Sequence, residues 1–210
     1  MRRVPLILLL VLGVLAACGS SSSNAITVNF VGGTNCDTNG RSPYSPSPPD
    51  TNSAPVGQPV DEMPHVHVAQ GTIVQYNHNP PTSGCHYSLG VGIAPIAPGV
   101  YGPEQAAKLI AEYWVHNLEH GYIVVSYKCP TGCDSQLESL NTWYRTLPPD
   151  PGGHVAYAKF IAVPYPAQKD KWDVESWDWF DSMGSTLNLA EVQKFYANHV
   201  NQAAEGAASG

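Results

Sequence analysis

The chain has 210 residues, and its 17 Asp plus Glu outnumber its 10 Lys plus Arg, which gives a formal net charge of -7. This acidic balance, without any run of Lys or Arg inside the chain, argues against nucleic acid or an electrostatic membrane patch as a partner. The length is enough for one domain of ordinary size and leaves little room for two.

The first residues follow the order of an export signal. Arg2 and Arg3 precede a short apolar stretch, Val4 to Val14, which is too short to span a bilayer as a permanent helix. The string LAAC then ends at Cys18 and resembles the lipobox of bacterial lipoproteins, which implies cleavage before Cys18 and its acylation. We therefore expect residues 1–17 to be a signal peptide and the mature protein to be exported and anchored by lipid to a membrane of the cell envelope, on its periplasmic or extracellular face. An ordinary cleaved signal peptide is the alternative.

Residues 18–59 follow the expected cleavage site and are rich in Ser, Pro, Asn and Gly. Such a segment buries too little apolar surface to offset the entropy lost on ordering, so we predict a linker, within which residues 26–31 alternate like a short strand. The folded, histidine-rich domain is expected at residues 60–203, and a polar tail at residues 204–210.

The predicted elements of this domain mix strands and helices. β-Branched and aromatic residues predict strands at 71–76 and 122–127, and alternation predicts a third at 154–163. A helical stripe of apolar residues spans 104–119 and is stopped by Gly121, and similar patterns predict helices at 136–146 and 187–200. The expected fold class is α+β, a small and mainly antiparallel sheet packed with helices in a single domain.

Four cysteines remain besides Cys18, and in an oxidising compartment two disulfides are the default. The spacing of Cys129 and Cys133 permits a local bridge, which would leave Cys36 for Cys85, but all three pairings stay open. Because Cys129 and Cys133 do not match the C-x-x-C redox motif, a structural bridge is expected of them.

Trp172, Trp177, Trp179 and Phe180 form an aromatic group near the end of the domain. Such a group can line a carbohydrate or peptide groove. Packing in the core or at its edge is the expected role, because aromatic side chains dominate core energetics.

The spacing of the histidines points to a metal. His116 and His120 lie four apart on the predicted helix, so both imidazoles project from one face about 6 Å apart. His65 and His67 lie two apart, and on an extended strand such a pair also shares a face. His86 is the third element, in the loop that follows residue 80.

Two sulfur-bearing residues accompany these histidines, Met63 two residues before His65 and Cys85 directly before His86. Imidazole with thioether or thiol suits copper and zinc better than calcium or magnesium. We therefore expect a copper or zinc site, with copper slightly favoured, formed by His86, His116, His120 and one of His65 or His67.

Three motifs in order resemble the domain-of-unknown-function 3105 family: PPTSG-x-H ending at His86, GVY at residues 99–101, and HNLEHG from His116. The resemblance covers roughly residues 60–200. It implies functional positions at His86, His116, Glu119 and His120, and it implies an exported or membrane-anchored protein. Cys85 departs from the proline that this family usually has there.

Two other functions fit the same residues. The string H-x-x-E-H at 116–120 is also the pattern of inverted zinc peptidases, in which Glu119 would act as the general base of a zinc-dependent hydrolase. In the other, the histidines hydrogen-bond to backbone groups of a metal-free structural or partner-binding lipoprotein.

Overall fold

The computed structural model describes residues 56–205. The predicted signal peptide, Cys18, Cys36, the expected strand at residues 26–31 and most of the predicted linker and tail lie outside these residues. Within the described part of the chain, no helix has the length and apolar character needed to cross a bilayer.

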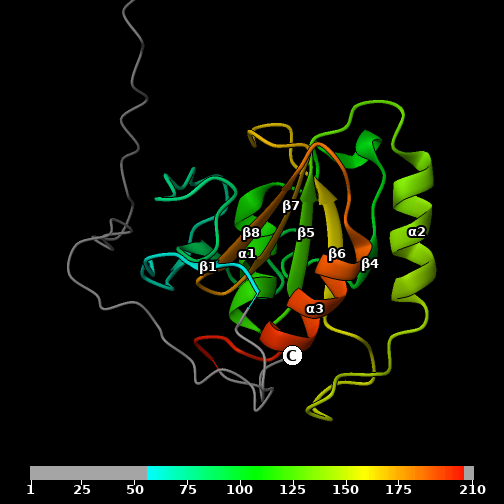
Figure 1. Ribbon diagram of the computed structural model, residues 1–210. Coiled ribbons are helices and arrows are strands. Elements are labelled where there is room, and N and C mark those ends of the chain that lie inside the picture. Colours follow the sequence, from blue (N-terminus) through cyan, green and yellow to red (C-terminus); the bar gives the residue numbers. More distant parts are fainter. Residues whose placement is uncertain (1–55, 206–210) are drawn as a thin grey trace, which may run out of the picture.

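A six-stranded sheet organises the described residues (Figure 1). Its order is β1-β8-β7-β5-β6-β4. The β1–β8, β8–β7 and β7–β5 pairs are antiparallel, whereas β5–β6 and β6–β4 are parallel. The strands are β1 (Gln58–Pro59), β4 (Gly99–Val100), β5 (Ile123–Tyr127), β6 (Phe160–Pro164), β7 (Trp172–Ser176) and β8 (Trp179–Gly184).

Helices lie on both faces of this sheet (Figure 1), and the mostly antiparallel strands agree with the predicted α+β class. Alternate residues of β5 enter two different cores, since side chains of a strand point in turn to opposite faces. Val125 packs with α2 (Asp134–Tyr144) and α3 (Leu189–His199), and Val124 packs with α1 (Ala111–Glu119). The strand predicted at 122–127 is thus confirmed as β5, which lies inside the sheet between β7 and β6.

The helix predicted at 104–119 forms only in its second half. A 3-10 turn, η1 (Pro103–Gln105), is followed by turns, and Ile110 is extended with φ -69° and ψ 159°. That extended residue interrupts the helical hydrogen bonds, so α1 starts at Ala111. Its end agrees with the prediction, because Gly121 follows the helix with φ +78°.

The prediction of a strand at 71–76 is wrong. Its backbone groups do not join a sheet: the Val74 N–H donates to the Glu112 carboxylate at 3.1 Å, and the Thr72 N–H donates to the Ala69 carbonyl. Strand propensity depends on a partner strand, and side-chain and turn hydrogen bonds take that place here. The strand predicted at 154–163 is shorter than expected, beginning at Phe160.

Strands β7 and β8 carry many polar residues and were not predicted. Asp173 and Glu175 are buried on the α1 side of β7, while Trp172 of the same strand packs into the opposite core. Trp177 is buried as well. The aromatic group therefore packs in the core, as expected.

A second, two-stranded sheet lies beside α1. In it β2 (His67–Val68) pairs in parallel with β3 (His86–Tyr87), and the register sets His67 opposite His86. This pairing places His67 beside His86, although the two residues are nineteen positions apart in the sequence.

Candidate metal centre

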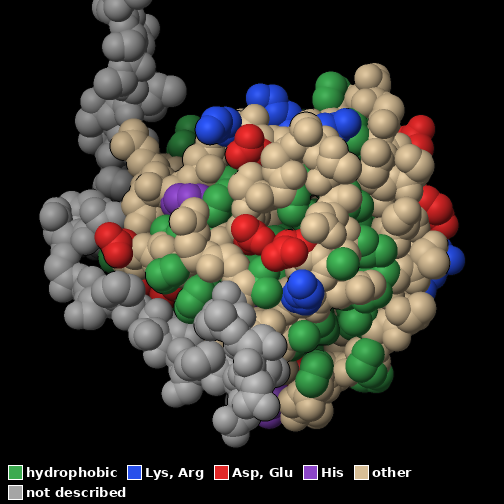
Figure 2. Space-filling model, viewed as in Figure 1, with side chains coloured by type: hydrophobic (Ala, Val, Ile, Leu, Met, Phe, Trp, Pro, Cys, Tyr) green, Lys and Arg blue, Asp and Glu red, His purple; other side chains and the backbone are tan. Residues whose placement is uncertain are grey.

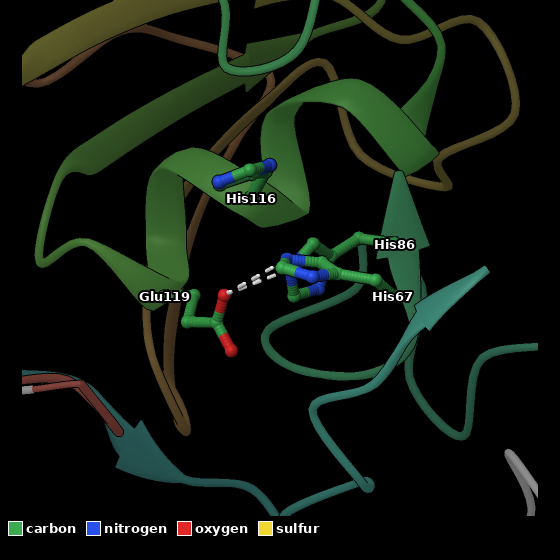
Figure 3. Close-up of side chains that lie close together, drawn as sticks. All are labelled: His67, His86, His116 and Glu119. Carbon is green, nitrogen blue, oxygen red and sulfur yellow. Dashed lines mark hydrogen bonds and ion pairs between the residues drawn. The ribbon is translucent and has the colours of Figure 1, made fainter. Parts of the chain in front are cut away.

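Three histidines and one glutamate come together between this small sheet and α1 (Figure 3). His67 comes from β2, His86 from β3, and His116 and Glu119 from α1. One ligand atom of each lies within 4.8 Å of those of the others. On a helix, residues three apart share a face, which is why His116 and Glu119 both point toward the strands.

Backbone carbonyls orient two of the imidazoles. The Nδ1–H of His86 donates to the Gly84 carbonyl at 2.8 Å, and the Nδ1–H of His116 donates to the Tyr87 carbonyl at 2.6 Å. In a neutral ring, each bond leaves Nε2 as the nitrogen without a proton. A ring fixed through one nitrogen by a carbonyl, with the other nitrogen directed inward, is the usual arrangement of a metal-binding histidine.

Glu119 lies at the middle of the group. Its Oε2 is 2.8 Å from His86 Nε2 and 3.9 Å from His67 Nε2. Since His86 Nδ1–H is already donated to Gly84, a neutral ring has no second proton to share with Glu119. Either a proton or a metal ion must therefore lie between His86 and Glu119.

The size of the group fits a tetrahedral ion after small side-chain rotations. Ligand atoms about 2.1 Å from zinc are about 3.4 Å from each other in such a geometry. The separations here reach at most 4.8 Å, and His86 Nε2 lies 2.8 Å from Glu119 Oε2.

Burial and charge favour the deprotonated forms of His116 and Glu119, which are the forms that bind a metal. Burial lowers the pKa of His116 to about 4, although its bond to Tyr87 works in the opposite direction. Burial by itself would raise the pKa of Glu119, but the bond to His86 and the charges of His86, His65 and His67 outweigh it and hold that pKa below its usual value. A neutral imidazole and an ionised carboxylate are the ligand forms.

His65 is not one of the four candidate ligands, but it contacts one of them, Glu119. Its Nδ1 lies 3.1 Å from Glu119 Oε1, the oxygen that faces away from His86. The His65 ring also meets the edge of buried Trp177, with ring centroids 6.0 Å apart. His65 therefore orients the carboxylate from outside the group.

His120, expected to pair with His116, is not brought into the group of four. Its ring lies beside that of His116, with centroids 4.6 Å apart, but its Nδ1 lies 3.3 Å from Glu205 Oε2. The reason is its place at the end of α1, where the helix gives way to Gly121. The helix thus contributes a pair three apart, His116 and Glu119, and not the pair four apart.

The two candidate sulfur ligands lie elsewhere. Met63 is buried against Cys85 and Val74, and its sulfur accepts the Asn77 N–H at 3.2 Å. Cys85 is disulfide-bonded. The expectation of a thioether or thiol ligand is not supported by this arrangement.

The structure forms the local bridge between Cys129 and Cys133 that their spacing permits. It closes the loop before α2, and none of the four candidate ligands lies in that loop. The orienting carbonyls of Gly84 and Tyr87, by contrast, had no sequence signal, because any residue carries such a group.

Comparison with known proteins identifies the family. A family model described as "Protein of unknown function (DUF3105)" matches residues 67–209, a stretch that contains all four members of the group. No curated protein and no solved structure matches the chain. Because the match covers more than half of the sequence, the chain belongs to the DUF3105 family.

Proposed function

We propose that this protein is an exported lipoprotein that binds one divalent transition-metal ion at His67, His86, His116 and Glu119. One observation carries the metal site: ligand atoms from three separate segments lie within 4.8 Å, and two of the rings are turned toward each other by backbone carbonyls. Unrelated surface histidines would not share such orienting bonds.

Three imidazoles and a carboxylate favour zinc(II), with copper(II) second. Without a thioether or thiolate in the group, nothing selects copper(I), and imidazole suits both zinc and copper, so the tetrahedral fit is what favours zinc. A carboxylate adds a hard, anionic ligand that a divalent ion accepts. This reverses the order that Met63 and Cys85 suggested.

Export and lipid attachment at Cys18 rest on the leader sequence alone. They fit the site, since a protein outside the cytoplasm meets metal ions that are not buffered by cytosolic thiols, and its disulfides persist there. Palmitate labelling of the full chain, lost in a Cys18→Ala variant, tests this part independently of the metal.

Elemental analysis of the full-length protein, exported and purified in nonionic detergent without chelator, tests the metal site. We expect zinc or copper at one ion per chain, and its loss in His67→Ala. That variant is well suited because the His67 side chain is 48% exposed, so its removal costs little packing. His154→Ala, an exposed histidine away from the group, is the matched control and should keep the ion.

A protein that purifies without metal and takes up neither zinc(II) nor copper(II) contradicts the proposal. In that case the imidazoles hold the β3 loop on α1 as a structural device, through the bond from His116 to the Tyr87 carbonyl and the contact of His86 with Glu119.

Glu119→Gln separates this proposal from a hydrolase that uses Glu119 as general base. A hydrolase of that kind keeps its metal in the variant and loses only turnover. Here Glu119 lies among the imidazoles at ligand distance, so we expect the variant to lose most of its metal affinity. Full metal content in Glu119→Gln favours the hydrolase.

A further inference from the structure

A cavity of about 370 Å³ lies at the start of α1. Its size falls in the range of pockets for small molecules. Three segments form its walls, namely residues 73–76, 106–112 and 164–167, and the lining is mainly apolar. Glu112 and Glu119 are two helical turns apart, about 10 Å along the axis, so this cavity is distinct from the metal centre.

Glu112 supplies the charge of this cavity. Its side chain is 8% exposed, and its Oε1 accepts the Val74 N–H at 3.1 Å. Among residues 56–205, the ion pairs that form do not include Glu112, and the cavity lining contains neither Lys nor Arg. Carboxylates are rarely buried without a cationic partner.

The start of α1 offsets only part of this charge. Glu112 lies in the first helical turn, where the helix dipole is equivalent to about half a positive charge. A net negative charge therefore remains at the wall of a largely apolar cavity.

Two tyrosine rings complete the lining near Glu112. Tyr76 is fixed by a hydrogen bond from its hydroxyl to the Cys85 carbonyl at 3.0 Å, and Tyr165 rests edge-on against Trp114, with centroids 5.7 Å apart. Burial raises the pKa of both tyrosines, and the charge of Glu112 raises it further. Aromatic faces beside a carboxylate are the surroundings that an organic cation prefers.

We propose that this cavity, here called the Glu112 cavity, binds a small organic cation that carries an ammonium group. The ammonium lies at Glu112 beside Tyr76 and Tyr165, and the apolar remainder packs against Leu109 and Ile110. A neutral ligand would leave the buried carboxylate without a cationic partner, and an anion would be repelled.

Binding of choline to the full-length protein in nonionic detergent tests the proposal, measured by ligand-observed NMR titration. The neutral carbon isostere, 3,3-dimethylbutan-1-ol, has the same shape without the charge. We expect saturable binding of choline and no saturable binding of the alcohol. Glu112→Gln keeps an acceptor for Val74 and should weaken choline binding by roughly tenfold or more, because it removes the charge.

Glu104→Gln is the matched control, since Glu104 is an exposed carboxylate of η1 and its loss changes the net charge equally. Equal weakening in both variants overturns the proposal and indicates only long-range attraction. Equal binding of the alcohol, or no saturation with choline, overturns it as well. Should Glu112→Gln not fold, Tyr165→Leu serves, with loss of choline binding expected and unchanged binding against the proposal.

Discussion

Glu119 receives an imidazole on each of its two oxygens, His86 on Oε2 and His65 on Oε1. Partners that orient a ligand from outside the coordination sphere typically change metal affinity by 10- to 100-fold (roughly) when they are removed. His65 is such a partner, because it contacts the ligand Glu119 without belonging to the group of four.

We expect His65→Ala to weaken zinc affinity by about 10- to 100-fold while the stoichiometry stays at one ion. Competition with a chromogenic chelator measures this. His154→Ala should leave the affinity unchanged. Loss of stoichiometry in His65→Ala would instead make His65 a ligand.

His116 makes the metal-free protein sensitive to acid. Its pKa is about 4 in the folded protein and 6.5 in the unfolded chain, so the unfolded chain binds its proton first. The free energy of unfolding therefore falls as the pH drops from about 6.5 to about 4, by up to about 3 kcal/mol. Asp173, whose pKa burial raises to about 6, acts in the opposite direction over the same range.

Urea unfolding of the metal-free protein at pH 7 and pH 4.5 isolates this contribution when wild type is compared with His116→Asn. Asp173 and the other titrating groups are common to both proteins. We expect a steeper loss of stability in wild type. Equal losses in the two proteins would show that His116 is not the cause.

At the scale of the elements, the end of α1 depends on Gly121. The residue has φ +78°, and a Cβ there would lie 2.7 Å from Asn201 Cα, a backbone atom. An alanine thus meets both a backbone conformation that costs about 1–2 kcal/mol and a contact that requires the chain to shift. The turn and the segment after α3 hold each other in place.

Gly121→Ala should lower the free energy of unfolding by at least about 1 kcal/mol more than Gly153→Ala does. Gly153 has φ +73° but open space around it, so it reports the backbone cost alone. Urea denaturation of both variants measures the difference. Equal costs would mean that the segment at Asn201 moves freely aside.

The elements that sequence reasoning predicted well are those with a strong local pattern, namely β5, α2 and α3. Strand β7 was missed because buried Asp173 and Glu175 break the apolar signal. The prediction of a strand at 71–76 was wrong because the Val74 amide donates to the side chain of Glu112 in α1, a contact that no local pattern shows. His116 and Glu119 were accessible as a helical pair, but the pairing of His67 with His86 depends on a two-residue ladder without such a signal.

At the scale of the whole molecule, a metal ion would join regions that few backbone bonds connect. The small β2–β3 sheet has two residue pairs, whereas the large sheet has long ladders around β5. On the face shown in Figure 2, acidic, basic and apolar side chains are interspersed, and little histidine reaches the surface.

Zinc at a hundredfold excess over its dissociation constant should stabilise the protein by about 2.7 kcal/mol. For a protein of this size, that raises the midpoint of thermal unfolding by about 5–10 °C. Differential scanning calorimetry checks this, with His67→Ala as the variant that should not respond. A response of equal size in that variant would place the ion elsewhere.

The ligands differ in solvent exposure, and this difference sets the order in which they can dissociate from the ion. His86 and His116 are buried and tied to carbonyls, whereas half of the His67 side chain faces solvent. Water or a competing chelator can therefore replace His67 first, while the α1 pair and His86 still hold the ion. The ion should pass to a competing chelator by stepwise ligand exchange that begins at His67 of β2. The rate of this exchange will therefore depend on the concentration of the chelator and not only on spontaneous release of the ion.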